Sequence, residues 1–196
     1  MADQTPRGKA AESRCDPRAH TYDVQEILPE EYGLFLSHLL RLDARTREDR
    51  FGMAASDQFL RQYVETTRAV GTLVLVSIEA GQVRASAELR PVPDPDAAEA
   101  TVCVEPAWRG RGIATRLMSQ IVDEAKSRGV RRLYVRCLAT NAAMRSLAAK
   151  FTPHLVLDAT DVTGRIDAVR WRVRHPLHAL VRRVLVGARA ALSARA

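Results

Sequence analysis

The sequence predicts a mixed α/β (α+β) domain in which helices flank a mostly antiparallel central sheet that contains one parallel β-α-β unit. Apolar residues repeat with helical spacing in several segments, and β-branched runs of strand length lie between these segments. The expected strands at 99–104 and 132–138 are joined through a helix. Such a connection makes two neighbouring strands parallel, whereas the short turns elsewhere favour antiparallel neighbours.

The N-terminal part is expected to contain a tail, a strand and two helices. Residues 1–20 are charged and contain prolines, which indicates a flexible tail. A short strand at 22–28 leads to a helix that begins at Pro29, because proline and acidic residues are favoured in a first helical turn. A second helix at 56–67 begins with Ser56, a typical N-cap residue.

The middle of the chain changes to strand periodicity. The runs 72–78 and 83–89 flank a short turn that contains glycine, which predicts a β-hairpin. A proline-rich loop at 91–96 then leads to the strand at 99–104. This part of the chain therefore supplies three consecutive antiparallel strands.

Helices and strands alternate in the C-terminal half. The expected elements are a helix at 112–128, a strand at 132–138, a helix at 141–151 and strands at 155–159 and 164–173. Gly129 ends the first of these helices, because glycine readily adopts the left-handed conformation of a helix C-cap. We expect one domain at 21–175.

The composition is that of a globular chain, with 46% hydrophobic and 27% charged residues. No apolar run is long enough to span a membrane, and the N-terminus has no signal-peptide pattern, so a cytoplasmic protein without a membrane span is expected. Cys15, Cys103 and Cys137 have neither the spacing of a disulfide framework nor that of a metal site. No metal is expected.

Positive charge is concentrated at the C-terminus. Eight arginines and one acid, Asp167, lie between 164 and 196, which accounts for the whole net charge of +7. We expect a basic amphipathic helix at 176–196 that packs its apolar face on the domain or on a second subunit. No nucleic-acid partner is expected, and the choice between monomer and homodimer stays open.

A glycine-rich string at 98–117, A-E-A-T-V-C-V-E-P-A-W-R-G-R-G-I-A-T-R-L, carries the clearest chemical signal. Gly110 and Gly112 allow the backbone to approach a ligand closely. The helix that follows presents unpaired N–H groups and the positive end of its dipole, and Arg109 and Arg111 add charge. These features predict a cradle for a pyrophosphate.

Two common nucleotide folds are disfavoured. The string lacks the third glycine of G-x-G-x-x-G, and the strand at 132–138 does not end in the acid that a dinucleotide fold requires. A Walker sequence ending in Gly-Lys-Ser/Thr is also absent from the chain.

The string R-x-x-G-x-A at 109–114, placed after V-C-V at 102–104, resembles the acetyl-CoA loop of the GNAT superfamily. The string N-A-A-M-R-S-L at 141–147, placed after a strand, resembles a second element of that family. The resemblance covers about 70–173. It implies a GNAT fold, acetyl-CoA as the acyl donor and transfer of an acetyl or other short acyl group to an amine.

The resemblance also implies which residues hold the donor. The backbone of Val102, Cys103 and Val104 would pair with the pantetheine arm, and Asn141 would contact the same arm or cap its own helix. The residues implied to hold the pyrophosphate are Arg109, Gly110, Arg111, Gly112, Ile113, Ala114 and Thr115.

An amine must lose a proton before it attacks a thioester, which requires a general base. Glu99, Glu105 and Glu88 are the candidates, and Glu99 is favoured because its spacing is similar to that of the base in Pat-type bacterial protein-lysine acetyltransferases. That similarity favours a protein lysine as the acceptor. A small-molecule amine is an alternative. Many GNAT enzymes have, at the position of Ala148, a tyrosine that acts as the general acid for the leaving thiolate. A catalytically degenerate acyl-CoA-binding module is therefore a further alternative.

Overall fold

The computed structural model describes residues 22–158 and 160–169. The tail expected at 1–20 and the helix expected at 176–196 lie outside the described residues. Seven strands of the described residues form one sheet in the order β1-β2-β3-β4-β5-β7-β6. They are β1 (Val24–Glu26), β2 (Leu73–Glu79), β3 (Gln82–Pro91), β4 (Ala97–Val104), β5 (Arg132–Leu138), β6 (Leu155–Asp158) and β7 (Asp161–Asp167). Within the described part of the chain, only β4 and β5 pair in parallel, so the predicted sheet is confirmed.

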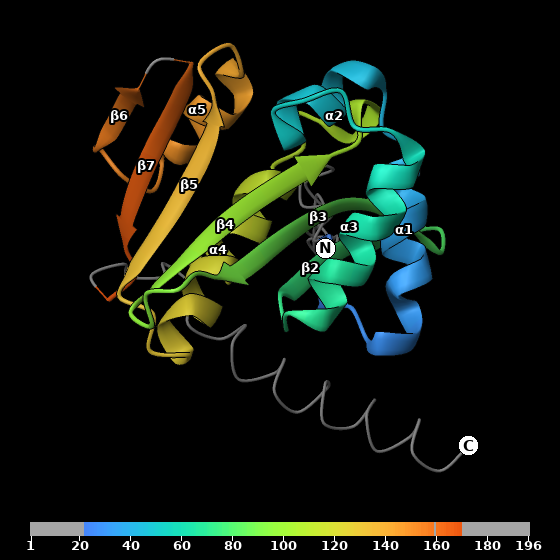
Figure 1. Ribbon diagram of the computed structural model, residues 1–196, viewed down its shortest axis with the longest axis horizontal. Helices are drawn as coiled ribbons and strands as arrows, with labels where there is room; N and C mark the ends of the chain where they lie inside the picture. Colours follow the sequence, from blue (N-terminus) through green and yellow to red (C-terminus); the bar gives the residue numbers. More distant parts are fainter. Residues whose placement is uncertain (1–21, 159, 170–196) are drawn as a thin grey trace, which may run out of the picture.

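Helices cover both faces of this sheet (Figure 1). They are α1 (Tyr32–Leu40), α2 (Ala44–Phe51), α3 (Asp57–Ala69), α4 (Ile113–Ser127) and α5 (Ala142–Ala148), with 3-10 turns η1 (Pro29–Glu31) and η2 (Pro106–Trp108). The core has two parts because side chains alternate across a strand. Leu73 and Leu75 of β2 pack with α4, whereas Val74 and Val76 pack with α1 and α3.

Local sequence explains where α3 and α4 begin. Ser56 precedes α3, and its hydroxyl accepts a hydrogen bond of 3.2 Å from the N–H of Phe59, as predicted for an N-cap. Gly112 precedes α4 with φ of +78°, a conformation that side chains disfavour. Fully buried Leu117 and Ile121 then hold α4 against the sheet.

The main differences from the sequence prediction concern α2 and β7, while other elements differ by a few residues at their ends. The helix α2 was not predicted, because its sequence ARTREDRF has no apolar stripe that indicates a helix. Its N-cap Asp43 accepts a hydrogen bond of 2.8 Å from the N–H of Thr46, and Gly52 ends it in the left-handed conformation. The strand expected at 164–173 is β7, which begins earlier, at Asp161.

The strands β4 and β5 pair over only part of their lengths. Ala97–Ala100 of β4 align with Arg132–Val135 of β5. Beyond this point β4 continues beside β3, while β5 continues beside β7. The two strands therefore diverge toward their C-terminal ends, near α2 (Figure 1).

Candidate active site

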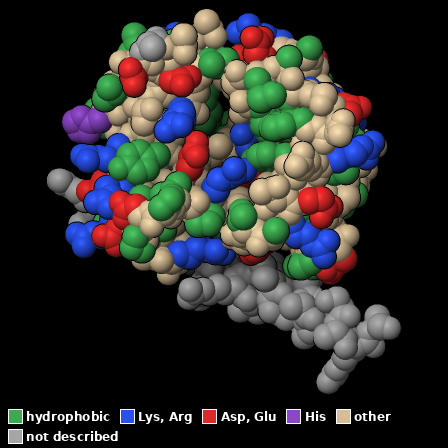
Figure 2. Space-filling view, viewed as in Figure 1, with side chains coloured by type: hydrophobic (Ala, Val, Ile, Leu, Met, Phe, Trp, Pro, Cys, Tyr) green, Lys and Arg blue, Asp and Glu red, His purple; other side chains and the backbone are tan. Residues whose placement is uncertain are grey.

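A pocket of about 830 Å³ opens where β4 and β5 diverge. Figure 2 shows this hollow with both acidic and basic side chains along it. The strands β3, β4 and β5 contribute one wall, and α2, α3 and the start of β7 contribute the others. It is lined by Asp49, Arg50, Phe51, Gly52, Phe59, Gln62, Tyr63, Thr66, Arg90, Glu99, Thr101, Arg136, Cys137, Leu138, Thr160 and Asp161.

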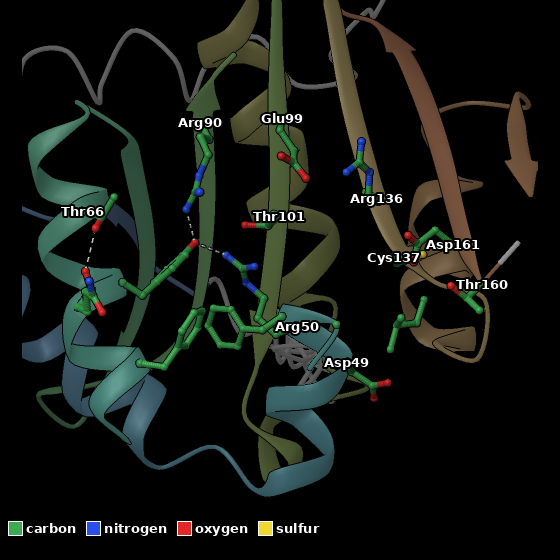
Figure 3. A pocket seen from close by; sticks show the side chains of 16 residues that line it. Asp49, Arg50, Thr66, Arg90, Glu99, Thr101, Arg136, Cys137, Thr160 and Asp161 are labelled. Carbon is green, nitrogen blue, oxygen red and sulfur yellow. Dashed lines mark hydrogen bonds between the residues drawn. The ribbon is translucent and has the colours of Figure 1, made fainter. Parts of the chain in front are cut away.

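Glu99 is the one candidate base that lines this pocket. It lies on β4 at the last part of the β4–β5 pairing, opposite Arg90 of β3 and Tyr134 of β5. Its side chain is half-buried, and within residues 22–158 and 160–169 it forms no hydrogen bond or ion pair. In Figure 3 its carboxylate points toward the space between the strands.

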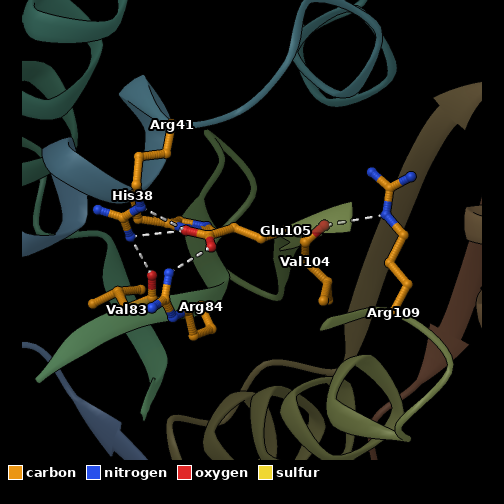
Figure 4. A network of polar contacts seen from close by, with 7 residues as sticks. All are labelled: His38, Arg41, Val83, Arg84, Val104, Glu105 and Arg109. Atoms are coloured by element: carbon orange, nitrogen blue, oxygen red, sulfur yellow. Dashed lines mark hydrogen bonds and ion pairs between the residues drawn. The ribbon is translucent and has the colours of Figure 1, made fainter. Parts of the chain in front are cut away.

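Glu105 belongs to a different network, outside the pocket (Figure 4). Its Oε1 accepts hydrogen bonds from Arg41 at 2.8 Å and from His38 Nδ1 at 3.1 Å, and its Oε2 accepts one from Arg84 at 3.1 Å. Burial alone raises the pKa of Glu105, but these hydrogen bonds outweigh it and lower the pKa to about 2. Such a carboxylate is a weak base at neutral pH.

Glu88 is almost completely buried, with 1% of its surface exposed. Its Oε1 accepts a hydrogen bond of 2.5 Å from Arg50, and its Oε2 accepts one of 2.6 Å from the hydroxyl of Tyr63. Burial disfavours a charge on Arg50, but the adjacent Glu88 carboxylate outweighs this effect and raises the pKa of Arg50. Glu88 is therefore held in a buried ion pair and does not line the pocket.

The edge of β4 at Val102–Val104 faces the divergence. The N–H of Glu105 donates to the carbonyl of Arg84 on β3 at 3.0 Å. Because hydrogen-bonded positions alternate along an antiparallel pair, the backbone groups of Val102 and Val104 point the other way, toward β5. β5 has no register with β4 at these residues. An edge of this kind can accept an extended ligand as an added strand.

The loop at 109–115 has the backbone geometry of an anion cradle. Gly110 and Gly112 have φ of +75° and +78°, and a Cβ added to either would meet no atom within 4 Å. Within the described part of the chain, the N–H groups of Ile113, Ala114 and Thr115 donate no hydrogen bond; the first bond of α4 runs from the N–H of Arg116 to the carbonyl of Gly112. Open space and unbonded donors fit a pyrophosphate.

The two arginines of this loop make contacts within the protein. Arg109 donates to the carbonyl of Val104 at 3.2 Å and to the hydroxyl of Thr46 at 2.7 Å, which links the loop to α2. Arg111 stacks on the ring of Trp108, with its guanidinium carbon 4.5 Å from the ring centroid. Thus Arg109 shapes the loop, and Arg111 provides charge at its rim.

Asn141 immediately precedes α5, and Lys150 follows the end of this helix. Asn141 caps α5 and accepts a hydrogen bond of 2.9 Å from the N–H of Met144; its amide also donates to the carbonyl of Asp49 at 3.4 Å. Lys150, which sequence reasoning missed, donates to the hydroxyl of Thr115 at 3.1 Å. The predicted capping role of Asn141 is confirmed.

Sequence reasoning also missed the residues that α2 and α3 contribute to the pocket. Phe59 and Tyr63 have the helical spacing of an apolar stripe on α3, which indicates a core role, but both line the pocket. The rings of Phe51 and Tyr63 meet edge to face, with centroids 5.0 Å apart. A tyrosine within an otherwise apolar stripe was the available signal, and it is weak because tyrosine often occurs in cores.

Cys103 and Cys137 are free thiols, and both are buried. Burial raises the pKa of Cys103 to about 12 and also raises that of Cys137, so both thiols stay protonated at neutral pH.

In the described ranges, no group of three or more His, Cys, Asp and Glu residues could hold a metal ion. Among the same residues, no helix is long and apolar enough to cross a membrane.

Comparison with known families gives one clear match. The model of the acetyltransferase (GNAT) family matches residues 33–152. The curated mycothiol acetyltransferase of Thermobifida fusca (strain YX) is 30% identical over 155 residues, which cover 73% of this chain and 46% of that protein. The chain thus spans about half the length of this relative.

Solved structures share the fold. The GNAT domain of S. lividans PAT has a TM-score of 0.65 at 21% identity, over 74% of this chain and 89% of that one. A putative acetyltransferase of Salmonella typhimurium, yncA, solved with its cofactor acetyl-CoA, has a TM-score of 0.55 at 19% identity, over 79% and 98%. A ribosomal-protein-alanine N-acetyltransferase of Brucella melitensis has a TM-score of 0.58 at 20% identity, over 74% and 99%.

Proposed function

The chain belongs to the GNAT acetyltransferase family, and from this premise we propose that it transfers the acetyl group of acetyl-CoA to the nitrogen of an amine, with Glu99 as the general base. The observation that carries this proposal is the position of Glu99. It lies in a pocket at the divergence of β4 and β5, on the strand whose free edge continues to the Gly-rich loop.

The donor side of the site is formed by one continuous segment. The N–H groups of Gly110–Thr115 and the positive end of α4 would hold the pyrophosphate, with Arg111 and Lys150 at the rim. The backbone of Val102–Val104 would pair with the pantetheine arm, and Asn141 would close the far side. Acetyl-CoA supplies a thioester, whose acetyl group is activated toward attack by an amine.

Glu99 would take the proton from the acceptor ammonium, either directly or through a water molecule. The environments of the two other candidate bases, Glu88 and Glu105, support this assignment. Glu105 is held by three cationic or imidazole partners outside the pocket, and Glu88 is sealed in an ion pair with Arg50. A backbone N–H at the free edge of β4 would polarise the thioester carbonyl. The acceptor then attacks directly, without a covalent enzyme intermediate.

The leaving thiolate would take its proton from solvent. Tyr63 is the tyrosine of the pocket lining, but its hydroxyl already donates to Glu88 and accepts from Arg50 at 2.7 Å. Burial, together with Glu88, raises the pKa of Tyr63 to about 12 even though Arg50 opposes the shift. Ala148, at the position of the usual acidic tyrosine, has no proton to give. A thiolate is a weak enough base to need no dedicated acid.

The acceptor has two candidate classes. The Pat-like spacing around Glu99 favours a protein lysine. The 30% identity to a protein named mycothiol acetyltransferase favours a small molecule, and a pocket of about 830 Å³ is large enough to enclose one. We place the small-molecule amine first, because the pocket is walled on several sides by α2, α3 and the start of β7.

Release of free CoA thiol from acetyl-CoA tests the proposal, with a panel of small amines and a lysine peptide as acceptors. Glu99→Gln should lower kcat/KM for the amine about 10²–10⁴-fold near neutral pH, while the KM for acetyl-CoA stays unchanged. Raising the pH should reduce the deficit, because more of the acceptor is then already a free amine.

Glu79→Gln is the matched control, since Glu79 is exposed at the end of β2 and lies away from the pocket. It should keep wild-type kinetics. A Glu99→Gln protein with full turnover at every pH would contradict the assignment of the base. Tight CoA binding without turnover of any acceptor would instead favour the acyl-CoA-binding module.

A further inference from the structure

We propose that the acceptor amine carries an anionic group, a carboxylate or a phosphate, that Arg90 and Arg136 bind on either side of Glu99. This inference rests on the proposed function, because it concerns the acceptor half of the same site. It identifies the substrate class by the charge that the pocket presents beside its base.

The register of the sheet brings the three side chains together. Arg90 of β3 is the direct cross-strand partner of Glu99 of β4, and such partners have Cβ atoms about 5 Å apart. Tyr134 of β5 is the partner of Glu99 on the other side, and Arg136 follows two residues later. Residues two apart on a strand share a face. All of Arg90, Glu99 and Arg136 line the pocket, and Figure 3 shows Glu99 between the two arginines.

Arg90 is held in place by the wall beneath it. Its Nη2 donates a hydrogen bond of 2.6 Å to the hydroxyl of Tyr63, and its guanidinium lies 5.0 Å from the centroid of the Tyr63 ring. Tyr63 is in turn fixed by its bonds to Arg50 and Glu88. The remaining donors of Arg90 are therefore oriented before any ligand arrives, which lowers the entropic cost of binding an anion.

The guanidinium of Arg136, unlike that of Arg90, is not held by neighbouring side chains of the described residues. Within the described residues it forms no hydrogen bond and no ion pair, although its side chain lines the pocket. A guanidinium presents several donors in one plane, and these match the oxygens of a carboxylate or a phosphate. A ligand in the pocket can therefore bind the guanidinium of Arg136.

The charges at this end of the pocket do not balance. Arg50 and Arg90 share one carboxylate, Glu88, at 2.5 and 3.9 Å, and Arg136 forms no ion pair within the described residues, so positive charge beside Glu99 stays uncompensated. A simple alkyl ammonium would add to that excess, whereas an anionic group on the acceptor would compensate it.

The other acids of the lining are Asp161 and Asp49. Asp161 lies at the start of β7 beside Cys137, across the divergence from Arg90 (Figure 3). Asp49 lies 3.3 Å from Arg45 in an ion pair of its own. Within the described residues, neither carboxylate forms an ion pair with Arg90 or Arg136.

Matched acceptors test this inference. Alkylamines are compared with amino acids of equal chain length, and in a second arm with aminoalkyl phosphates, by release of free CoA thiol. The anionic amines should have a kcat/KM at least about tenfold above that of the plain amines, as expected for charge-assisted hydrogen bonds. The arm with the larger preference identifies the anion as carboxylate or phosphate.

Arg136→Gln and Arg90→Gln should each remove most of that preference by raising the KM for the anionic amines. They should leave the KM for acetyl-CoA and the rates with plain amines nearly unchanged. Arg136→Lys should retain part of the preference, because the charge remains while the planar fork is lost. Arg132→Gln is the matched control: Arg132 lies on the same strand but outside the pocket, and pairs with Asp94.

Equal use of plain and anionic amines, or a preference that survives both glutamine variants, would overturn the inference and leave the proposed function intact. Turnover of lysine peptides alone, without any need for a nearby acidic residue, would overturn it in the same way. Failure of every acceptor in the wild-type protein would instead overturn the proposed function. Circular dichroism of each variant excludes misfolding as the cause of a loss.

Discussion

The imidazole of His38 and the carboxylate of Glu105 form a buried hydrogen bond of 3.1 Å that joins α1 to the end of β4. Burial lowers the pKa of His38, although the Glu105 carboxylate opposes the shift, so the neutral ring donates through Nδ1. Arg41 of α1's C-cap and Arg84 of β3 complete the network (Figure 4). The segment that leads into the Gly-rich loop is therefore fixed by charge as well as by packing.

Glu105→Gln should lower the free energy of unfolding by about 3 kcal/mol at pH 7, since it removes the charge that His38, Arg41 and Arg84 surround. The pKa of this carboxyl is about 2 in the folded protein and near its ordinary value of 4.5 when unfolded. The contribution is therefore complete above about pH 5 and is lost as the pH falls toward 2.

Urea denaturation at several pH values between 7 and 3 measures this dependence. The difference between wild type and Glu105→Gln should stay constant from pH 7 to about pH 5 and should shrink as the pH falls further. Glu79→Gln, the exposed control, should show little difference at any pH. A Glu105→Gln deficit that stays constant with pH would mean that the shape of the side chain matters and its charge does not.

Gly112→Ala should weaken donor binding more than it weakens the fold. Gly112 has φ of +78°, so a side chain there costs about 1 kcal/mol in the backbone, although the added Cβ meets no atom within 4 Å. In the proposed complex that same open space holds the pyrophosphate. The KM for acetyl-CoA should therefore rise at least about tenfold, as measured by release of free CoA thiol.

Gly71→Ala is the control for this experiment, because Gly71 has φ of +68°, an equally open surrounding and no place in the loop. Its thermal stability should fall about as much as that of Gly112→Ala, while its KM for acetyl-CoA stays at the wild-type value. Equal KM values of the two variants for acetyl-CoA would contradict the assignment of the Gly112 loop as the pyrophosphate-binding site.

The sequence was sufficient for the elements whose apolar periodicity is strong. The apolar stripe of α4 and the parallel pairing of β4 and β5 could be predicted from the sequence. The spacing of apolar residues differs between helices and strands and therefore indicates the type and order of these elements. The sequence of α2 has no such apolar periodicity. The helix is held by its Asp43 cap, by the bond from Arg109 to Thr46 and by the Arg50–Glu88 ion pair.

The same distinction holds for the site. The Gly-rich loop is local in sequence, so its residues could be named in advance. The pocket is not local: Tyr63, Arg90 and Arg136 come from three elements that only the sheet register and the packing of α3 bring together. Among the three candidate glutamates, burial and hydrogen-bond partners distinguish Glu99 from Glu88 and Glu105, and neither property is encoded in local spacing.

Ala148 provides a last test, because it occupies the position of the usual acidic tyrosine. It is buried in α5, with 1% of its surface exposed, and it does not line the pocket. Its Cβ lies near Gly164 of β7, where an added Cβ would be 3.9 Å away. A tyrosine there would overfill the core and leave its hydroxyl without a partner.

Ala148→Tyr should therefore destabilise the fold by about 1–3 kcal/mol and should not increase turnover. Ala143→Tyr, on the exposed face of the same helix, should leave the melting temperature nearly unchanged. Thermal unfolding and thiol release on both variants provide the comparison. A stable Ala148→Tyr protein with faster turnover, and with a rate that declines as a phenol ionises near pH 10, would mean that the new side chain reaches the thioester and that α5 can repack around it.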